Sequence, residues 1–201
     1  MGNVILLNGS PRAPKSNSKK YSEIFIHNYK GNAKYYEISK KNHQQLCAEI
    51  ETASDIVFVF PLYVDTIPVT LLNFLKTLKE YPANQKPTVH ILINCGFLEP
   101  EQNHIALEVM KLFCKQHGYP FGSTLSIGGG EAILKTPLAF FAKQKIKKLA
   151  KAIFRNQSCH LQVTMPLSKP RYLKESTKYW IRYGEKHGIT KEEMDTMEIE
   201  A

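Results

Sequence analysis

The sequence predicts an α/β protein in which a mostly parallel sheet is covered by helices on both faces. Short apolar runs alternate with segments whose apolar residues recur at helical spacing. The runs are apolar almost throughout, as in strands that are buried on both faces. The chain has 201 residues, of which 43% are hydrophobic, and this suits one globular domain with a short appendage.

The N-terminal half begins with an unbroken apolar run at residues 3–8, which predicts a buried strand ending at Gly9. A polar loop follows, and then a helix over residues 18–28, where Tyr21, Ile24 and Phe25 have helical spacing. Polar residues at 33–39 predict an edge strand. We expect the next elements to be a helix at 42–53, a strand at 55–63, and a helix after Pro68 with an apolar face of Val69, Leu71, Leu72, Leu75 and Leu78.

The C-terminal half continues the alternation and then departs from it. The expected elements are a strand at 88–95, a helix at 101–117 that stops at Gly118, a strand at 123–127, the glycines 128–130 and a helix at 138–154. Beyond Cys159 the pattern breaks, since residues 160–166 could form an extra strand and residues 170–187 form a helix. We therefore expect a domain at 1–157 and an extension at 158–201 that packs on this core or on a second subunit.

Composition excludes several classes of protein. The longest clean apolar run, Ile56 to Val64, is too short to span a bilayer, and no secretory signal is recognisable. The four cysteines are too widely spaced for a zinc knuckle and too few for a disulfide framework. These features predict a soluble cytoplasmic protein with reduced thiols and no bound metal.

Charge is concentrated in one part of the chain. The net charge is +9, from 27 basic and 18 acidic residues. Between Lys135 and Lys186 there are 13 basic residues against Glu175 and Glu185 alone. The segment 143–155 is basic and amphipathic, a pattern that can bind anionic membranes or acidic partners. We do not expect such contact, because its apolar stripe is needed to cover the sheet, and we expect no nucleic-acid partner.

The loop after the first strand is a candidate phosphate site. In an open α/β sheet, ligands bind at the carboxyl ends of strands where the strand order reverses. Backbone N–H groups and the positive dipole end at a helix start attract anions, and Arg12 can add a bidentate contact. Single residues of these types often only cap a helix, but several together favour phosphate binding. The candidate side chains are Ser10, Arg12, Ser16, Asn17 and Ser18.

A nucleotide P-loop is a second interpretation of the same loop. Gly9 to Ser16 nearly matches the pattern Gly-x4-Gly-Lys-Ser, with Pro14 in place of the second glycine. Proline has no N–H to offer a phosphate, and no aspartate closes an apolar strand to hold magnesium. The P-loop interpretation is therefore disfavoured.

Two motifs together resemble a known family. Gly-Ser-Pro-Arg with Ser-Asn-Ser follows the first strand, and Pro-Leu-Tyr-x4-Pro follows the third. This pairing resembles the flavodoxin-like NAD(P)H-dependent FMN oxidoreductases over about residues 3 to 154. The resemblance implies a three-layer sandwich with a five-stranded parallel sheet in the order 2-1-3-4-5 and a C-terminal helical extension. It also implies FMN as cofactor and NADH or NADPH as co-substrate.

The resemblance also assigns roles to individual residues. Ser10, Arg12, Ser16, Asn17 and Ser18 would hold the FMN phosphate. The isoalloxazine ring would lie along Pro61, Leu62, Tyr63 and Val64 and be bordered by Asn94, Cys95, Gly96 and Phe97. Gly129 and Gly130 would allow close approach of the backbone. Phe97 could equally be an ordinary packing residue, whereas for Tyr63, which follows the strand proline, packing is the weaker alternative.

The expected function is hydride transfer from NAD(P)H through FMN to a quinone, a flavin or a similar small acceptor. The cofactor carries this chemistry, so no catalytic side chain is named. Cys95 is interpreted as a buried structural thiol and His104 as a surface residue. The alternative is a non-catalytic electron carrier or an FMN-binding regulatory protein with the same loops. Similar flavoproteins often dimerise, which implies a homodimer.

Overall fold

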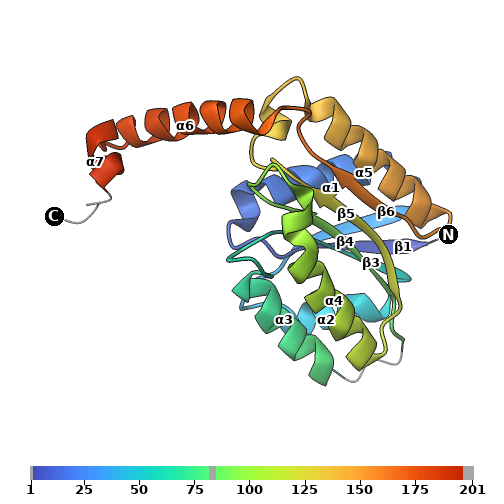
Figure 1. Ribbon diagram of the computed structural model, residues 1–201. Coiled ribbons are helices and arrows are strands. Elements are labelled where there is room, and N and C mark those ends of the chain that lie inside the picture. The colour runs from blue at the N-terminus through green and yellow to red at the C-terminus, as the bar shows by residue number, and fades with distance from the viewer. Residues whose placement is uncertain (1, 82–84, 197–201) are drawn as a thin grey trace. The chain divides into compact units, whose positions relative to one another are not determined.

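The computed structural model describes residues 2–81 and 85–196, and the chain divides into two compact units at residue 165. The first unit is an α/β sandwich and the second consists of two helices (Figure 1). The first unit therefore extends beyond residue 157, where the sequence predicted the boundary. Within the described residues, no helix combines the length and the apolar character needed to cross a membrane.

One parallel sheet of six strands forms the centre of the first unit, in the order β2-β1-β3-β4-β5-β6. The predicted order 2-1-3-4-5 is confirmed, but the predicted number of five strands is wrong. The sixth strand pairs in parallel with β5, Thr124 lying opposite His160. The strands are β1 (Asn3–Asn8), β2 (Asn32–Glu37), β3 (Asp55–Pro61), β4 (Thr88–Asn94), β5 (Phe121–Ile127) and β6 (His160–Val163).

The helices lie in two layers, one on each face of the sheet. Helices α1 (Asn17–Asn28) and α5 (Ala139–Phe154) pack side by side on one face. The other face is covered by α2 (His43–Glu51), α3 (Val69–Glu80) and α4 (His104–His117) (Figure 1). Gly118 ends α4 with a left-handed φ of 70°, as the sequence predicts for a C-terminal glycine. The expected three-layer arrangement is thus observed.

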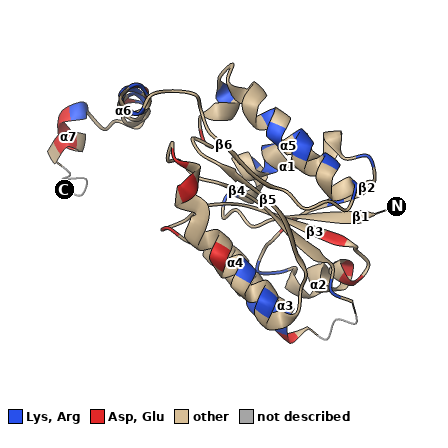
Figure 2. Cartoon of the chain, turned by 45° about the vertical axis from the view of Figure 1, so that its right-hand side comes forward, with Lys and Arg blue, Asp and Glu red and all other residues tan. Residues whose placement is uncertain are grey.

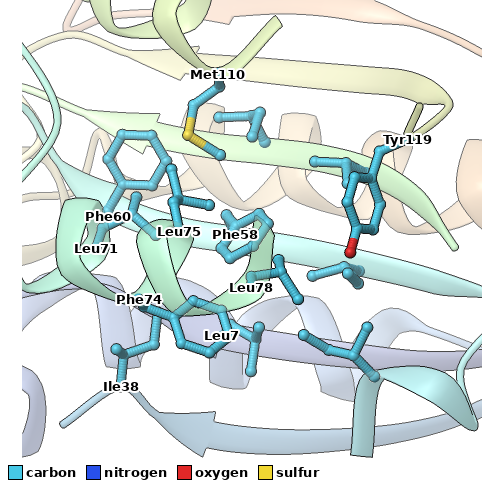
Figure 3. Close-up of a cluster of buried hydrophobic side chains, with 14 of the residues drawn as sticks. Leu7, Ile38, Phe58, Phe60, Leu71, Phe74, Leu75, Leu78, Met110 and Tyr119 are labelled. Atoms are coloured by element: carbon cyan, nitrogen blue, oxygen red, sulfur yellow. The ribbon is translucent and has the colours of Figure 1, made fainter. Parts of the chain in front are cut away.

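The core under α2, α3 and α4 is built from the apolar residues that predicted the elements. Phe58 and Phe60 of β3 project toward α3, where Leu71, Phe74 and Leu75 meet them (Figure 3). These side chains are buried almost completely. On the other face, the apolar stripe of α5 is buried as well, including Ile146 and Leu149. Removal of this surface from water is the main favourable term in folding.

The second unit contains α6 (Lys169–Glu185) and α7 (Lys191–Thr196). The predicted helical extension is present, with α7 in addition to the one expected helix. The two helices meet where a Cβ at Gly184 would overlap the methyl group of Met194. The unit is therefore a helical hairpin with a small contact of its own.

Candidate functional site

The carboxyl ends of β1, β3, β4 and β5 lie at the same end of the parallel sheet. Backbone hydrogen bonds connect the segments that follow β3, β4 and β5. Leu62 N–H donates to Asn94 O over 2.7 Å, and Cys95 N–H donates to Ile127 O over 3.0 Å. Gly130 N–H donates to Cys95 O over 2.8 Å. Ligands bind at this end of open α/β sheets, so the predicted site residues come together here.

Asn8, the last residue of β1, organises the loop that follows it. Its Nδ2 lies 3.2 Å from Ser16 Oγ, 3.3 Å from Ala13 O and 2.9 Å from the hydroxyl of Tyr35. Its Oδ1 accepts the N–H of Ser10 over 2.9 Å. Sequence analysis missed Asn8. The available signal was a polar residue at the end of an otherwise apolar buried strand.

Ser16 is the N-cap of α1. Its hydroxyl accepts the backbone N–H of Lys19 over 3.1 Å and donates to Ala13 O over 3.0 Å. The Ser10 hydroxyl similarly accepts the N–H of Arg12 over 3.3 Å. Both serines are buried. Their hydroxyls therefore shape the loop, and the structure gives Ser16 the capping role that sequence analysis weighed as the alternative.

Other donors around this loop remain suited to an anion. Arg12 is exposed, so its guanidinium can reach a ligand from solvent. The first turn of a helix has N–H groups without a carbonyl partner in the same helix, and here they belong to Asn17 and Ser18. Ser18 is buried, and its hydroxyl accepts a 3.4 Å hydrogen bond from Asn94 Nδ2. A hydroxyl that accepts in this way still has its own O–H to donate. This donor set suits a phosphate better than a metal cation.

The loop after β3 forms a strained turn. Tyr63 and Thr66 exchange two backbone hydrogen bonds, of 2.9 and 3.0 Å, around Val64 and Asp65. Both central residues have positive φ, 46° at Val64 and 55° at Asp65. A β-branched residue rarely adopts this conformation, and backbone strain tends to occur at functional sites. The turn presents Val64 to solvent with 91% of its surface exposed.

Exposed apolar side chains from two neighbouring loops accompany this turn. Tyr63 is 46% exposed and Phe97, in the loop after β4, is 51% exposed. Pro61 and Leu62 are half-buried beside them. Single exposed apolar residues are ordinary, whereas several together indicate a surface for a ligand or partner. Exposed aromatic side chains of this kind can stack against flat ring systems.

Cys95 does not face this surface. Its side chain is buried and its Sγ lies 3.6 Å from Asn103 Nδ2 and 3.7 Å from Glu99 O. Burial raises the pKa of the Cys95 thiol to about 11. A thiol that stays protonated at neutral pH is a poor nucleophile, so Cys95 is a packing residue. Gly96, next along the loop, is exposed.

The glycine turn after β5 packs against the start of α1. Gly129 has a φ of 59° and its N–H donates to Phe97 O. The carbonyl of Gly130 accepts the hydroxyl of Tyr21 over 2.7 Å and lies 3.3 Å from Asn17 Nδ2. A Cβ at Gly130 would lie 2.7 Å from Asn94 Cβ. The close approach that the glycines permit is thus made by the protein itself, and Asn17 directs its amide to this turn.

The remaining sequence interpretations concern surface and metal sites. His104 is exposed, as predicted. Among the residues that the structure describes, no three His, Cys, Asp or Glu side chains are placed to bind a metal ion.

Sequence analysis treated Tyr21 only as a helix residue. The structure connects it to the site, because its hydroxyl donates a hydrogen bond to the carbonyl of Gly130.

Comparison with known proteins establishes the fold. No family model and no curated protein sequence matches the chain. An FMN-dependent NADH-azoreductase from Bacillus anthracis str. Ames Ancestor, solved in complex with FMN, is 12% identical with a TM-score of 0.59, over 76% of this chain and 99% of that one. An NADPH-quinone reductase from P. pentosaceus is 16% identical with a TM-score of 0.59, over 76% and 97%.

A flavodoxin of Streptococcus pneumonia TIGR4 is comparably similar, with 10% identity and a TM-score of 0.57 over 76% of this chain and 99% of that one. At such low identities the similarity shows the fold alone. The first unit therefore has a flavodoxin-like fold with a sixth strand, and its candidate site lies where the strand order of that fold reverses.

Proposed function

We propose that the protein is an FMN-dependent oxidoreductase that takes hydride from NADH or NADPH and reduces a small acceptor such as a quinone or a flavin. One observation carries the proposal. The start of α1, whose free N–H groups suit an anion, lies with Arg12 at the same end of the sheet as the exposed aromatic side chains Tyr63 and Phe97. FMN has a phosphate at one end and a flat ring system at the other, so it needs both features.

The residues present fit this cofactor. Arg12, the first-turn N–H groups of α1 and the Ser18 hydroxyl would hold the phosphate. Leu62, Tyr63 and Val64 would lie along the ring, and Phe97 would border it. Solved structures with the same fold support the assignment, since the Bacillus anthracis azoreductase contains FMN. Asn8, Ser10 and Ser16 would hold the loop in shape, as their hydrogen bonds indicate.

Bound FMN supplies hydride acceptance and electron transfer to a second substrate. The chain's own residues bind and orient the reactants, and no side chain is required to take a proton. The exposed turn at Val64 and the half-exposed Tyr63 and Phe97 leave a face open to small molecules. A homodimer and a cytoplasmic location belong to the proposal as sequence-based predictions.

Absorbance spectra of the purified protein test the proposal. FMN is added, the excess is removed, and NADH or NADPH is then supplied without oxygen. Retained flavin absorption that bleaches with either nucleotide supports the reductase. Retained absorption that persists favours the electron carrier, which the similar flavodoxin structure makes the second candidate. Absence of retained flavin refutes both.

The phosphate assignment has a sharper test, because riboflavin lacks the phosphate of FMN. Arg12→Ala is expected to weaken FMN binding roughly tenfold or more, since a hydrogen bond to a charged group contributes about 1.5 to 3 kcal/mol. Riboflavin affinity is expected to stay unchanged. Arg155→Ala removes a cation beyond the end of α5 and serves as the control. Equal loss of riboflavin binding in Arg12→Ala would contradict the assignment.

A further inference from the structure

The two basic helices of the protein differ in where their apolar faces lie. Lys and Arg residues recur along α5 (Figure 2). Its apolar residues Ala142, Ile146, Leu149 and Ile153 are buried against the sheet, and its exposed apolar side chains, Phe140, Phe141 and Phe154, stand near its two ends. In α6 the large apolar side chains are exposed: Leu173 is 54%, Tyr179 46%, Trp180 51% and Tyr183 47% exposed. The surface of α6 therefore differs from that of an ordinary solvated helix.

Helical geometry places these side chains on one face of α6. At 3.6 residues per turn, positions 172, 173, 176, 179, 180 and 183 share a side of the helix. Ring contacts confirm the grouping, since Trp180 lies 5.2 Å from Tyr179 and 5.8 Å from Tyr183 between ring centroids. The cations Arg171, Lys174, Lys178 and Arg182 occupy the opposite side. On this side Lys178 forms a salt bridge of 3.0 Å with Glu175, and both side chains are exposed to solvent. Such a surface pair leaves the cations accessible to an anionic partner.

We propose that α6 binds in the plane of an anionic membrane surface, with its aromatic face toward the acyl chains and its cations toward lipid phosphates. Helices of this kind combine a charged face rich in Lys and Arg with Trp, Tyr or Leu on the other. Trp and Tyr favour the membrane interface because each has an apolar ring and a polar tip. Charge complementarity selects anionic over neutral lipid.

The charge of α6 disfavours a second copy of the chain as the occupant. Between Lys169 and Glu185 there are five cations and two carboxylates, a net charge of +3. Pairing two such helices would bring like charges together, and a dry interface would also need partners for the polar tips of its Tyr and Trp side chains. The inference does not depend on the proposed redox function, because binding to vesicles requires no flavin.

Trp180 is the only tryptophan of the chain, so its fluorescence reports on α6 alone. The full-length protein is titrated with phosphatidylcholine vesicles that contain about 30% phosphatidylglycerol, and with vesicles of phosphatidylcholine alone. We expect a blue shift of the emission and flotation of the protein with the anionic vesicles, both weakened by high salt. We expect neither with neutral vesicles.

A pair of matched variants assigns the binding to α6. Lys174→Glu with Lys178→Glu is expected to lower the affinity for anionic vesicles roughly tenfold or more. Lys147→Glu with Lys151→Glu reverses two lysines four residues apart on α5 and is expected to leave the blue shift intact. Leu173→Ser with Tyr179→Ser tests the apolar face and is expected to abolish the shift. Circular dichroism and the cooperativity of thermal unfolding check that each variant is folded.

Several results would overturn the proposal. One is absence of flotation with a folded wild-type protein. Another is binding that depends on the α5 lysines and not on those of α6. A third is a Trp180 emission that is already shifted in buffer and depends on protein concentration, because this would indicate that a second copy covers the helix.

Discussion

The hydroxyl of Tyr21 donates a 2.7 Å hydrogen bond to the carbonyl oxygen of Gly130 and so joins the first helix to the glycine turn 109 residues later in the chain. Tyr21 is completely buried. Burial raises its pKa far above the ordinary value, so the hydroxyl stays a donor at any working pH. The same turn is bonded to the loop after β4 through Cys95 O. One buried side chain thus connects the proposed phosphate helix to the loops that would border the ring.

Replacement of this hydroxyl tests the connection. Tyr21→Phe keeps the ring and removes the donor, so the free energy of unfolding is expected to fall by about 1 to 2 kcal/mol. Urea denaturation followed by circular dichroism measures the change. Tyr183→Phe alters an exposed tyrosine and is expected to change stability by less than about 0.5 kcal/mol. Equal stability of the two variants would show that the Tyr21 bond contributes nothing.

Two glycines of the site loops offer a matched comparison. A Cβ at Gly130 would lie 2.7 Å from Asn94 Cβ and 3.3 Å from Cys95 O, whereas a Cβ at Gly96 meets nothing within 4 Å. Gly130→Ala is therefore expected to lower the unfolding free energy by about 1 to 3 kcal/mol. Gly96→Ala is expected to stay within about 0.5 kcal/mol of the parent. Thermal denaturation of both variants decides this, and a larger loss for Gly96→Ala would contradict the described packing.

Strand and helix positions could be predicted because they depend on local apolar patterns, whereas the strand order followed from the resemblance to a known family. Ile56 to Phe60 are apolar in succession, and this alone indicates a strand buried on both faces. Residues 160–166 were predicted only as a possible extra strand, and not as part of the sheet, because His160 and Gln162 are exposed and leave no unbroken apolar run. Only pairing with β5 makes the segment a strand, and pairing is a tertiary property.

The location of the site was also predictable, but the roles within it were not. A run of Ser, Asn and Arg after a buried strand indicates an anion site, yet it does not show which hydroxyl will cap the helix. Ser16 does so because Asn8 and Lys19 converge on it. The Tyr21–Gly130 contact depends on residues distant in the sequence, so no local pattern reveals it.

The positive φ angles of Val64 and Asp65 predict a stabilising substitution. A left-handed conformation costs a non-glycine residue roughly 1 to 2 kcal/mol, and Val64 adopts one with φ of 46°. Val64→Asn is expected to raise the unfolding free energy by about 1 kcal/mol, because Asn tolerates this region. The side chain is exposed, so little packing is lost. Denaturant unfolding measures the gain, and Val69→Asn, at an exposed helical residue with negative φ, should show none.

A buried ionisable pair, Asp55 and His90, lies near the amino ends of β3 and β4, at the end of the sheet opposite to the candidate site. His90 Nε2 lies 3.0 Å from Asp55 Oδ1, and Ser54 donates to Asp55 Oδ2 over 2.7 Å. His90 Nδ1 accepts the backbone N–H of Ser123 over 2.8 Å, so the ring proton lies on Nε2 and points to the carboxylate. Burial by itself would raise the pKa of Asp55. The hydrogen bonds from His90 and Ser54 outweigh burial and hold the pKa below its ordinary value.

This lowered pKa predicts how stability depends on pH. A carboxylate with a pKa lower in the folded than in the unfolded state stabilises the fold above the unfolded pKa, which is 3.8 for Asp. That contribution is lost as the pH falls through the folded value. At pH 7, Asp55→Asn is expected to cost about 1 to 2 kcal/mol, because its bonds no longer involve a charge. The difference between the variant and the parent should shrink as the pH falls below about 4.

Urea denaturation of the parent and the variant across this pH range measures the effect. Glu108→Gln removes an exposed carboxylate that pairs with Lys111 over 3.5 Å, and since surface pairs contribute little, it should follow the parent at every pH. A cost for Asp55→Asn that is equal at neutral and acid pH would show that the site needs the shape of the side chain and not its charge. A cost that grows as the pH falls would reverse the sign of the linkage and contradict a lowered pKa at Asp55.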